Sequence, residues 1–419
     1  MNKMIKKLLI VLLGLVAVAA AAGYGRKAYR GAMERRLVSE ANYRLRTNDL
    51  KAAELCLAGA LRANPMSLPA TRMVAELLDR AGSPSVLSWR IRVAQLEPDN
   101  VTNRFEWAET ALKLDELKSA ADALGGVSDS AKGAGPYLKL CGALAWSRHD
   151  TLAAEKYYLE AARLEPENLA VKLNLDTIHL SSTNQAVAQA ARLALEQLTT
   201  NSAWRLNALE DLFKDAVARH SLPEALAFSK QLAMDREARF TDKLEYLQLL
   251  KVSTNAEFGS WLASLKAEAA GSPARAFALG RWIAGAEGTT NALDWVESLP
   301  PGIRTNQPVP LIVTDCQIAL KNWHALLQLV STQDWAEANF YRFAVEALAN
   351  RELGQEYTSQ SAWHKAMRQA SHRLDRLSRL AQVTIAWHWL PERTEVLRQI
   401  ASEFPKEKWA LESLPGKQQ

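Results

Sequence analysis

The sequence is poor in cysteine. Its 419 residues include three cysteines, Cys56, Cys141 and Cys316, and each stands alone within an apolar helical pattern. No CxxC pair and no histidine at zinc-finger spacing accompanies them, so the sequence predicts neither a disulfide framework nor a structural metal site. An isolated cysteine in such a pattern behaves as a small apolar residue, and we expect these three to pack in the interior.

The short motifs of common enzyme chemistry are also missing. The chain contains no P-loop, GxGxxG, HExxH or GxSxG motif. His364 and His372 lie eight residues apart in a helical pattern, but no third metal ligand accompanies them. Carboxylates are plentiful, yet no catalytic pair stands out. We therefore expect no enzyme activity, no cofactor and no metal ion.

A basic patch on the folded body is absent as well. The net charge is +5, but Lys3, Lys6 and Lys7 carry much of the excess, and no acidic residue precedes Glu34. Without these three lysines the chain holds 48 basic against 46 acidic residues. A nucleic-acid-binding domain concentrates basic residues on one face, so we expect no nucleic acid partner.

One long hydrophobic run stands near the N-terminus. Residues 8–25 are uncharged and read LLIVLLGLVAVAAAAGYG, which as a helix spans roughly 27 Å, close to the ~30 Å hydrocarbon core of a membrane. The run is either a retained single-pass anchor or a cleaved secretory signal, since its Ala-rich end offers cleavage sites. We favour the anchor because Arg26 and Lys27 follow at once. The lysine-rich start favours an extracytoplasmic (periplasmic) body, although basic residues on both sides leave a cytoplasmic body open.

The body carries an internal repeat. Its best unit runs from Leu138 to Pro166 and ends at that proline. The spacings Leu-x2-Cys-Gly-x2-Ala and Ala-x3-Tyr within the unit resemble the tetratricopeptide repeat family, here of a membrane-anchored bacterial type. The resemblance by motif covers roughly residues 34–200. The matching positions of the unit are Leu138, Cys141, Gly142, Ala145, Ala154, Tyr158, Ala161 and Pro166.

The register of the repeat is kept over five units. Steps of 33 or 34 residues join small or β-branched apolar residues, namely Ala53, Val86, Ala120, Ala154 and Ala188. Small residues let the two antiparallel helices of a unit approach closely. Larger apolar residues such as Leu57 and Tyr158 fill the space between units, because one unit cannot bury its apolar face alone.

Beyond residue 200 the consensus fades, but helical periodicity continues. Helix-start signals occur at Ser221–Glu224, Thr254–Glu257, Ser272-Pro273 and Asp334–Glu337. Predicted loops lie at residues 125–135, 285–290 and 299–310, and the last could mark a bend or a boundary. We expect an all-α, right-handed solenoid of antiparallel helix pairs behind an N-terminal transmembrane helix. The predicted segments are a membrane segment (1–30), tetratricopeptide repeats (31–200), degenerate repeats (201–414) and a flexible tail (415–419).

The resemblance implies a scaffold that holds a protein or peptide in a concave groove lined by first helices. On that side we expect Arg35, Asn42, Arg46, Lys139 and Trp146. The lysine and asparagine that clamp a C-terminal carboxylate in some family members are replaced here by Val38 and Ala143, so that ligand is not predicted. A second candidate is the basic stretch at Arg373, Arg376 and Arg379, which is a solvated helix face or a docking strip for an acidic segment or anionic lipid.

Two other functions stay open. The chain could be a passive spacer or assembly factor of a cell-envelope complex. It could also be a helical-toroid enzyme acting on envelope glycans, because 13 tryptophans is a high number and sugar sites use tryptophan. Six of these tryptophans are predicted within helices, where packing between repeats is the simpler use: Trp204, Trp261, Trp282, Trp295, Trp323 and Trp363.

Overall fold

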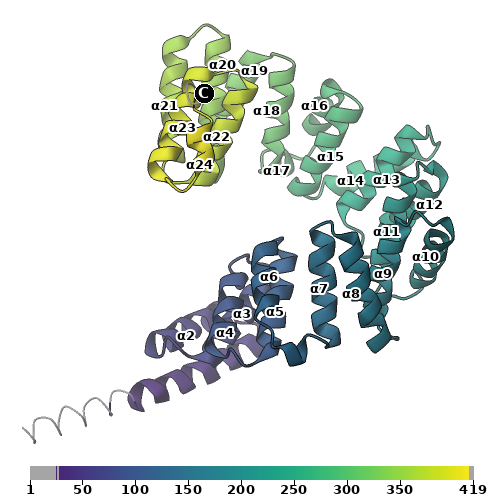
Figure 1. The fold of residues 1–419 in the computed structure, drawn as a ribbon. Coiled ribbons are helices and arrows are strands. Elements are labelled where there is room, and N and C mark those ends of the chain that lie inside the picture. The colour runs from purple at the N-terminus through teal and green to yellow at the C-terminus, as the bar shows by residue number, and fades with distance from the viewer. Residues whose placement is uncertain (1–24, 26–27, 415–419) are drawn as a thin grey trace, which may run out of the picture. The chain divides into compact units, whose positions relative to one another are not determined.

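The structure is a computed structural model that describes Gly25 and residues 28–414. Within this part of the chain every regular element is a helix and no strand occurs, as the sequence predicts. The chain divides into two compact units, residues 1–215 and 216–419. In each unit, helices that follow one another in sequence pack side by side (Figure 1).

Unit 1 consists of helix pairs, in which we call the members the first and second helix. Helix 28–46 packs on α2, with Ala41 in the same core cluster as Leu57 and Ala60. The other pairs are α3 with α4, α5 with α6, α7 with α8, and α9 with α10. A short 3-10 helix, η1 (Asp129–Ala131), lies between α6 and α7 in the predicted loop 125–135. The remaining bounds are α2 (Leu50–Ala63), α3 (Leu68–Arg80), α4 (Val86–Leu96), α5 (Val101–Lys113), α6 (Leu117–Gly125), α7 (Gly135–Ser147), α8 (Thr151–Leu164), α9 (Leu169–Leu180), α10 (Gln185–Leu198) and α11 (Arg205–Ala218).

Unit 2 also consists largely of helix pairs, which follow α12. Its pairs are α13 with α14, α15 with α16, α18 with α19, α20 with α21, and α22 with α23. The bounds are α12 (Leu222–Ala233), α13 (Phe240–Val252), α14 (Phe258–Ala269), α15 (Pro273–Ala286), α16 (Thr289–Glu297), α17 (Pro301–Arg304), α18 (Val309–Ala319), α19 (Trp323–Thr332), η2 (Ala336–Ala338), α20 (Asn339–Glu352), α21 (Glu356–Ala370), α22 (Leu374–Ala386), α23 (Leu390–Glu403) and α24 (Lys408–Glu412).

The predicted register is confirmed by burial. All five register residues, from Ala53 to Ala188, are at most 4% exposed. The reason for small residues is visible at Gly142, where an added Cβ would lie 2.9 Å from the Tyr158 ring. The second helix thus supplies a large side chain that fills the space left by the glycine of the first, and this fixes how closely α7 and α8 approach.

Helix starts follow ordinary capping chemistry. Asp49, Asn100, Asp150, Asn168 and Ser272 each accept a hydrogen bond from a backbone N–H of the helix that they precede. The start predicted at Thr254 is wrong. That residue has a positive φ of 48° in the preceding turn, and α14 begins only at Phe258, after Glu257.

Large aromatic residues fill the core of unit 2. Trp295, Trp363 and Trp389 are buried, and the rings of the last two meet edge to face at 5.8 Å. Trp387 packs on Trp389 at 5.3 Å, so the Trp-His-Trp sequence belongs to this core. These tryptophans therefore serve in packing, as predicted. Trp204 was predicted to lie in a helix, but it lies in the turn before α11.

The division between the units lies within α11, between Asp215 and Ala216. The predicted loop 299–310 instead contains α17 and leads into α18. The right-handed superhelical course and the flexible tail 415–419 stay predictions, and the tail lies outside the described residues.

Candidate functional site

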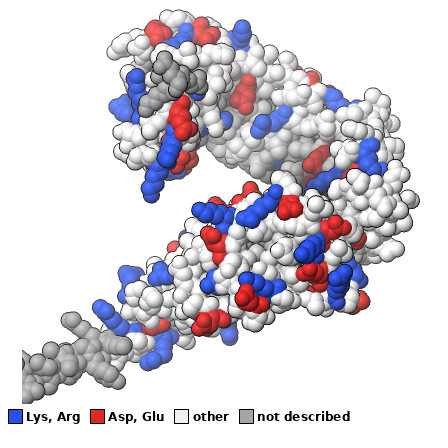
Figure 2. Space-filling model, viewed as in Figure 1, with Lys and Arg blue, Asp and Glu red and all other residues white. Residues whose placement is uncertain are grey.

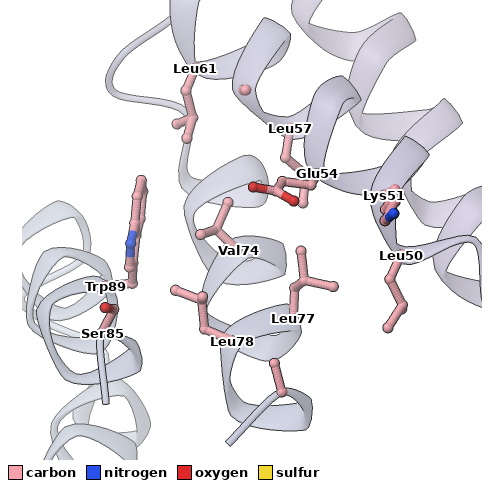
Figure 3. A pocket seen from close by; sticks show the side chains of 12 residues that line it. Leu50, Lys51, Glu54, Leu57, Leu61, Val74, Leu77, Leu78, Ser85 and Trp89 are labelled. Carbon is pink, nitrogen blue, oxygen red and sulfur yellow. The ribbon is translucent and has the colours of Figure 1, made fainter. Parts of the chain in front are cut away.

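The most apolar pocket described lies in unit 1. It has a volume of about 480 Å³ and is formed by α2, α3 and the start of α4 (Figure 3). We call it the α2–α4 groove. Its lining residues are Leu50, Lys51, Glu54, Leu57, Ala58, Leu61, Val74, Leu77, Leu78, Ala81, Ser85 and Trp89.

The groove follows from the way that the pairs stack. The two second helices, α2 and α4, form its walls, and the first helix between them, α3, forms its floor. Val74, Leu77 and Leu78 lie on that floor, and Trp89 faces them from the α4 wall (Figure 3). Because the walls do not close over α3, these apolar side chains remain accessible instead of being sealed in the core.

On the α2 side, the rim of the groove is partly charged and partly apolar. Lys51 and Glu54 are exposed and of opposite charge, while Ala58 and Leu61 continue the same wall as apolar residues. On the α4 side, the Arg92 guanidinium lies 5.5 Å from the centre of the Trp89 ring, within range of a cation–π contact. An apolar floor with a few charges at its edge suits an amphipathic segment of a partner.

The same geometry recurs in unit 2. A pocket of about 450 Å³ lies between the second helices α14 and α16 over α15, and another of about 550 Å³ lies between α16 and α19 over α18. Polar or charged residues, among them Glu287, Asp294 and Arg304, make up half or more of each of these two linings, whereas they are three of the twelve residues that line the α2–α4 groove. The α2–α4 groove is therefore the apolar member of a recurring set.

Three of the predicted concave residues lie on helix 28–46. Arg35, Asn42 and Arg46 are exposed and follow one another along that helix at steps of seven and four residues, which places them on one face. None of them lines the α2–α4 groove. Their role in partner binding stays a prediction.

The other two predicted concave residues lie on α7. Trp146 is 41% exposed, whereas Lys139 is half-buried and binds the Glu165 carboxylate at 3.0 Å. Glu165 also accepts a hydrogen bond from Asn168, the N-cap of α9. These hydrogen bonds, first from Asn168 and then from Lys139, lower the pKa of Glu165.

The contact of Lys139 is a repeated structural element. Two repeats earlier, Arg72 on α3 pairs with Glu97, which accepts a hydrogen bond from Asn100, the N-cap of α5. In both places a cation of the first helix binds the carboxylate that ends the second helix of its pair. Sequence reasoning missed this role, although a signal was available: in both places an asparagine follows the glutamate by three residues, and the cation precedes the glutamate by 25 or 26.

The predicted basic strip is largely neutralised in the structure. Arg373 forms an ion pair with Asp375 at 3.1 Å, and Arg376 pairs with Glu337. The Arg379 guanidinium lies 5.5 Å from the Tyr341 ring centre. Of the two predicted roles of this stretch, a solvated helix face suits these contacts better than a docking strip. The docking role stays a prediction.

Side chains able to bind a metal are not clustered in the part of the chain that the structure describes, although His179 Nε2 lies 2.9 Å from Glu155 Oε1. No group of three or more His, Cys, Asp or Glu side chains with metal-binding geometry occurs among these residues. Cys141 and Cys316 are buried as predicted, and Cys56 is half-buried. Burial raises the pKa of the Cys316 thiol to about 11, which disfavours the reactive thiolate.

The predicted membrane segment lies almost wholly outside the described residues, which include only Gly25 of residues 8–25. None of the helices in the described part has the length and apolar character needed to cross a membrane.

Comparison with known proteins reveals distant structural likeness only. No family model matches the sequence, and no curated protein matches it either. A solved structure of PilF from Pseudomonas aeruginosa is 15% identical, with 52% of this chain and 97% of that chain covered and a TM-score of 0.39. A human IFIT1 dimer with PPP-AAAA is 12% identical over 77% and 69% of the two chains, with a TM-score of 0.36. The Cut9–Hcn1 hetero-tetramer of APC/C is 10% identical over 90% and 95%, with a TM-score of 0.29.

Likeness at this level carries no argument about function. The fold rests on the chain's own features: antiparallel helix pairs, the buried register and the repeated capping of the pairs. These features describe a tetratricopeptide-like helical-repeat protein.

Proposed function

We propose that this protein is a membrane-tethered scaffold that binds an amphipathic helix of a partner protein in the α2–α4 groove. The observation that carries the proposal is the accessible apolar floor at Val74, Leu77 and Leu78. Val74, Leu77 and Leu78 are partly exposed, and contiguous apolar surface that solvent can reach marks interaction sites in folded proteins. A helix-in-groove mode places apolar side chains at helical spacing on such a floor.

Trp89 is the expected anchor of the interaction. Tryptophans that border an apolar pocket dominate many interfaces, and truncating such a residue costs ~2 kcal/mol or more. Its ring forms one wall of the groove (Figure 3). The charges of Lys51 and Glu54 at the opposite rim would set the direction of the bound helix through complementary charges on the partner.

A photo-crosslinking experiment tests the proposal. Ser85 is exposed and lines the groove, so Ser85→benzoylphenylalanine in the full chain should yield a discrete protein adduct in native membranes. Ala58→Arg, at an exposed position on the opposite wall, should fill the groove and lower the adduct yield at least ~10-fold. Ala190→Arg is the matched control, because Ala190 is also exposed, lies on the second helix α10 and lines none of the described pockets.

Two results would contradict the groove. The adduct could persist in the Ala58→Arg variant, or it could disappear when Arg35, Asn42, Arg46, Lys139 and Trp146 are substituted together. The second outcome would place the partner on the first-helix side, as the resemblance to tetratricopeptide proteins implies. Because Lys139 binds Glu165, this variant needs a circular-dichroism control for helicity.

Tethering is the second part of the proposal. It rests on the apolar run of residues 8–25, flanked by Lys6 and Lys7 before it and by Arg26 and Lys27 after it. We propose a single-pass anchor with the body on the extracytoplasmic side. Removing residues 1–25 should shift the protein from the membrane fraction to the soluble fraction. A full-length product that is already soluble and starts near Gly23 would show a cleaved signal instead.

The proposal includes no turnover of substrate. Metal-dependent or hydrolytic activity of the purified protein, lost on changing a single Asp or Glu, would overturn it in favour of the envelope-glycan enzyme.

A further inference from the structure

The first described helix has an exposed face that its pair does not cover. Helix 28–46 buries Ala41 and Leu45, but Tyr29, Met33 and Tyr43 are 70%, 39% and 59% exposed. Steps of four and ten residues place these three on one side of the helix, opposite the buried stripe. Three large apolar side chains are thus exposed along one stripe of a single helix, which they share with Arg36 and with Glu40.

The same helix also carries an excess of exposed positive charge. Arg30, Arg35, Arg36 and Arg46 are exposed, and no ion pair or hydrogen bond of their side chains occurs among the described residues. The two glutamates of the helix are already engaged. Glu34 accepts a hydrogen bond from Asn64 at 2.7 Å, and Glu40 pairs with Arg44 at 2.8 Å. Basic side chains gather around this end of the chain (Figure 2).

The position of the helix in the chain indicates which surface it meets. It follows directly after the apolar run 8–25 and two further basic residues, Arg26 and Lys27. If that run is in a membrane, helix 28–46 begins within a few residues of the lipid headgroups. Tyrosine and arginine are side chains that favour this interface, because they place an apolar body toward the acyl region and a polar tip toward the headgroups.

We propose that helix 28–46 lies along the membrane surface and binds anionic lipid headgroups, with Arg30, Arg35, Arg36 and Arg46 meeting the phosphates and Tyr29 and Tyr43 lying at the interface. The inference rests on the proposed tethering, and it adds a second contact to it. A single apolar segment combined with a basic patch holds a protein at an anionic membrane more firmly than either feature alone. Such a contact would hold the start of unit 1 at the bilayer.

Lipid photo-crosslinking in the full chain tests the inference. Tyr43→benzoylphenylalanine is placed in protein reconstituted with nanodiscs of phosphatidylcholine alone or with added phosphatidylglycerol. We expect lipid adducts at this position with phosphatidylglycerol present, and few with phosphatidylcholine alone. Replacing the four arginines by glutamine should lower the adduct yield at least ~10-fold, and high salt should lower it as well.

Matched controls separate this contact from general charge effects. The variant Lys321→Gln, Arg368→Gln, Arg398→Gln and Lys408→Gln removes the same charge from exposed positions of unit 2 and should leave the adduct yield unchanged. Tyr357, which is 87% exposed on α21, is the control site for the photoprobe and should give no lipid adduct. Equal yields at Tyr43 in both lipid compositions would overturn headgroup recognition.

A probe in the apolar run distinguishes the two proposals. Leu15→benzoylphenylalanine should form lipid adducts in both lipid compositions if the tether is in the membrane. Adducts at Leu15 without adducts at Tyr43 would overturn the inference and leave the tether. Adducts at Tyr43 with phosphatidylglycerol but none at Leu15 would support the headgroup contact and refute the tether.

Discussion

At the scale of single residues, small side chains decide how closely the two helices of a pair approach. Gly142 on α7 faces the Tyr158 ring of α8, and a Cβ at this glycine would come within 2.9 Å of ring carbon Cε2. Interiors this tightly packed respond to a single added methyl group. The glycines of the chain are not equivalent in this respect, since an added Cβ at Gly285 on α15 meets nothing within 4 Å.

Gly142→Leu should therefore lower the free energy of unfolding by ~1–3 kcal/mol or more, because the new side chain must displace Tyr158 or separate the helices. Gly285→Ala is the control. It should leave stability unchanged or raise it slightly, because alanine has the higher helix propensity. Chemical denaturation followed by circular dichroism measures both variants, and equal midpoints for Gly142→Leu and the unsubstituted protein would refute the register.

One repeat later, a charged residue occupies the position that glycine holds in α7. Asp176 on α9 is 34 residues after Gly142, and burial raises its pKa to about 6 while His179 and Lys172 act in the opposite direction. A folded-state pKa above the unfolded value of ~3.9 means that the ionised carboxylate destabilises the fold. The penalty is complete above pH 6 and disappears below about pH 4.

Asp176→Asn should accordingly raise the free energy of unfolding at pH 7 by ~1–2 kcal/mol, and the gain should vanish as the pH falls to 4. Urea denaturation across this pH range measures the difference between the two proteins. The exposed Asp122 on α6 provides a control, because Asp122→Asn should change stability by less than ~0.5 kcal/mol at any pH. A gain at Asp176 that does not depend on pH would mean that ionisation is not its cause.

At the scale of helices, the sequence predicted the parts of the fold that depend on local pattern. The spacing of Ala53, Val86 and Ala120 was sufficient because the contacts between paired helices repeat with the chain. The groove was not predictable in the same way. Leu78 and Trp89 are apolar residues within helical segments, which suits a core position, but in the structure both line the pocket between α2 and α4 and stay partly exposed.

Ion pairs between residues far apart in the sequence could not be predicted either. Lys139 was assigned to partner binding because its position in the first helix faces the concave side in related repeats. The structure places its ammonium on Glu165, which is 26 residues away and ends the second helix of the same pair. Side-chain length and local geometry, rather than periodicity, decide such a contact.

The caps of these helices can be tested individually. Asn168 accepts hydrogen bonds from the backbone N–H groups of Ala170 and Val171 at 3.1 and 3.3 Å and donates to Glu165. Asn168→Ala should cost ~1–2 kcal/mol of stability because it leaves the first turn of α9 without this partner. Asn322→Ala is the matched control, since Asn322 precedes α19 without a side-chain capping bond and should matter little. Equal costs in thermal unfolding would show that the side-chain cap is not the stabilising feature.

At the scale of the whole molecule, the helix pairs form two compact units with mostly sequential contacts. In such an architecture, stability is approximately the sum of each pair's own stability and its interfaces with the adjacent pairs. A local defect should then weaken its neighbours and leave remote pairs intact. This differs from a single-core globular domain, in which one cavity or clash lowers the stability of the entire structure.

Hydrogen exchange can measure this locality. Gly142→Leu should accelerate amide exchange in α7, α8 and the adjoining helices and leave α20–α23 unchanged, because opening propagates only through neighbouring interfaces. The reciprocal variant is Gly280→Leu in unit 2, where an added Cβ would lie 2.5 Å from Ile312 Cδ1. It should accelerate exchange in α15, α16 and α18 and spare α2–α6. If either substitution raised exchange uniformly along the described chain, the units would unfold as one cooperative body, and the additive account of this repeat protein would be wrong.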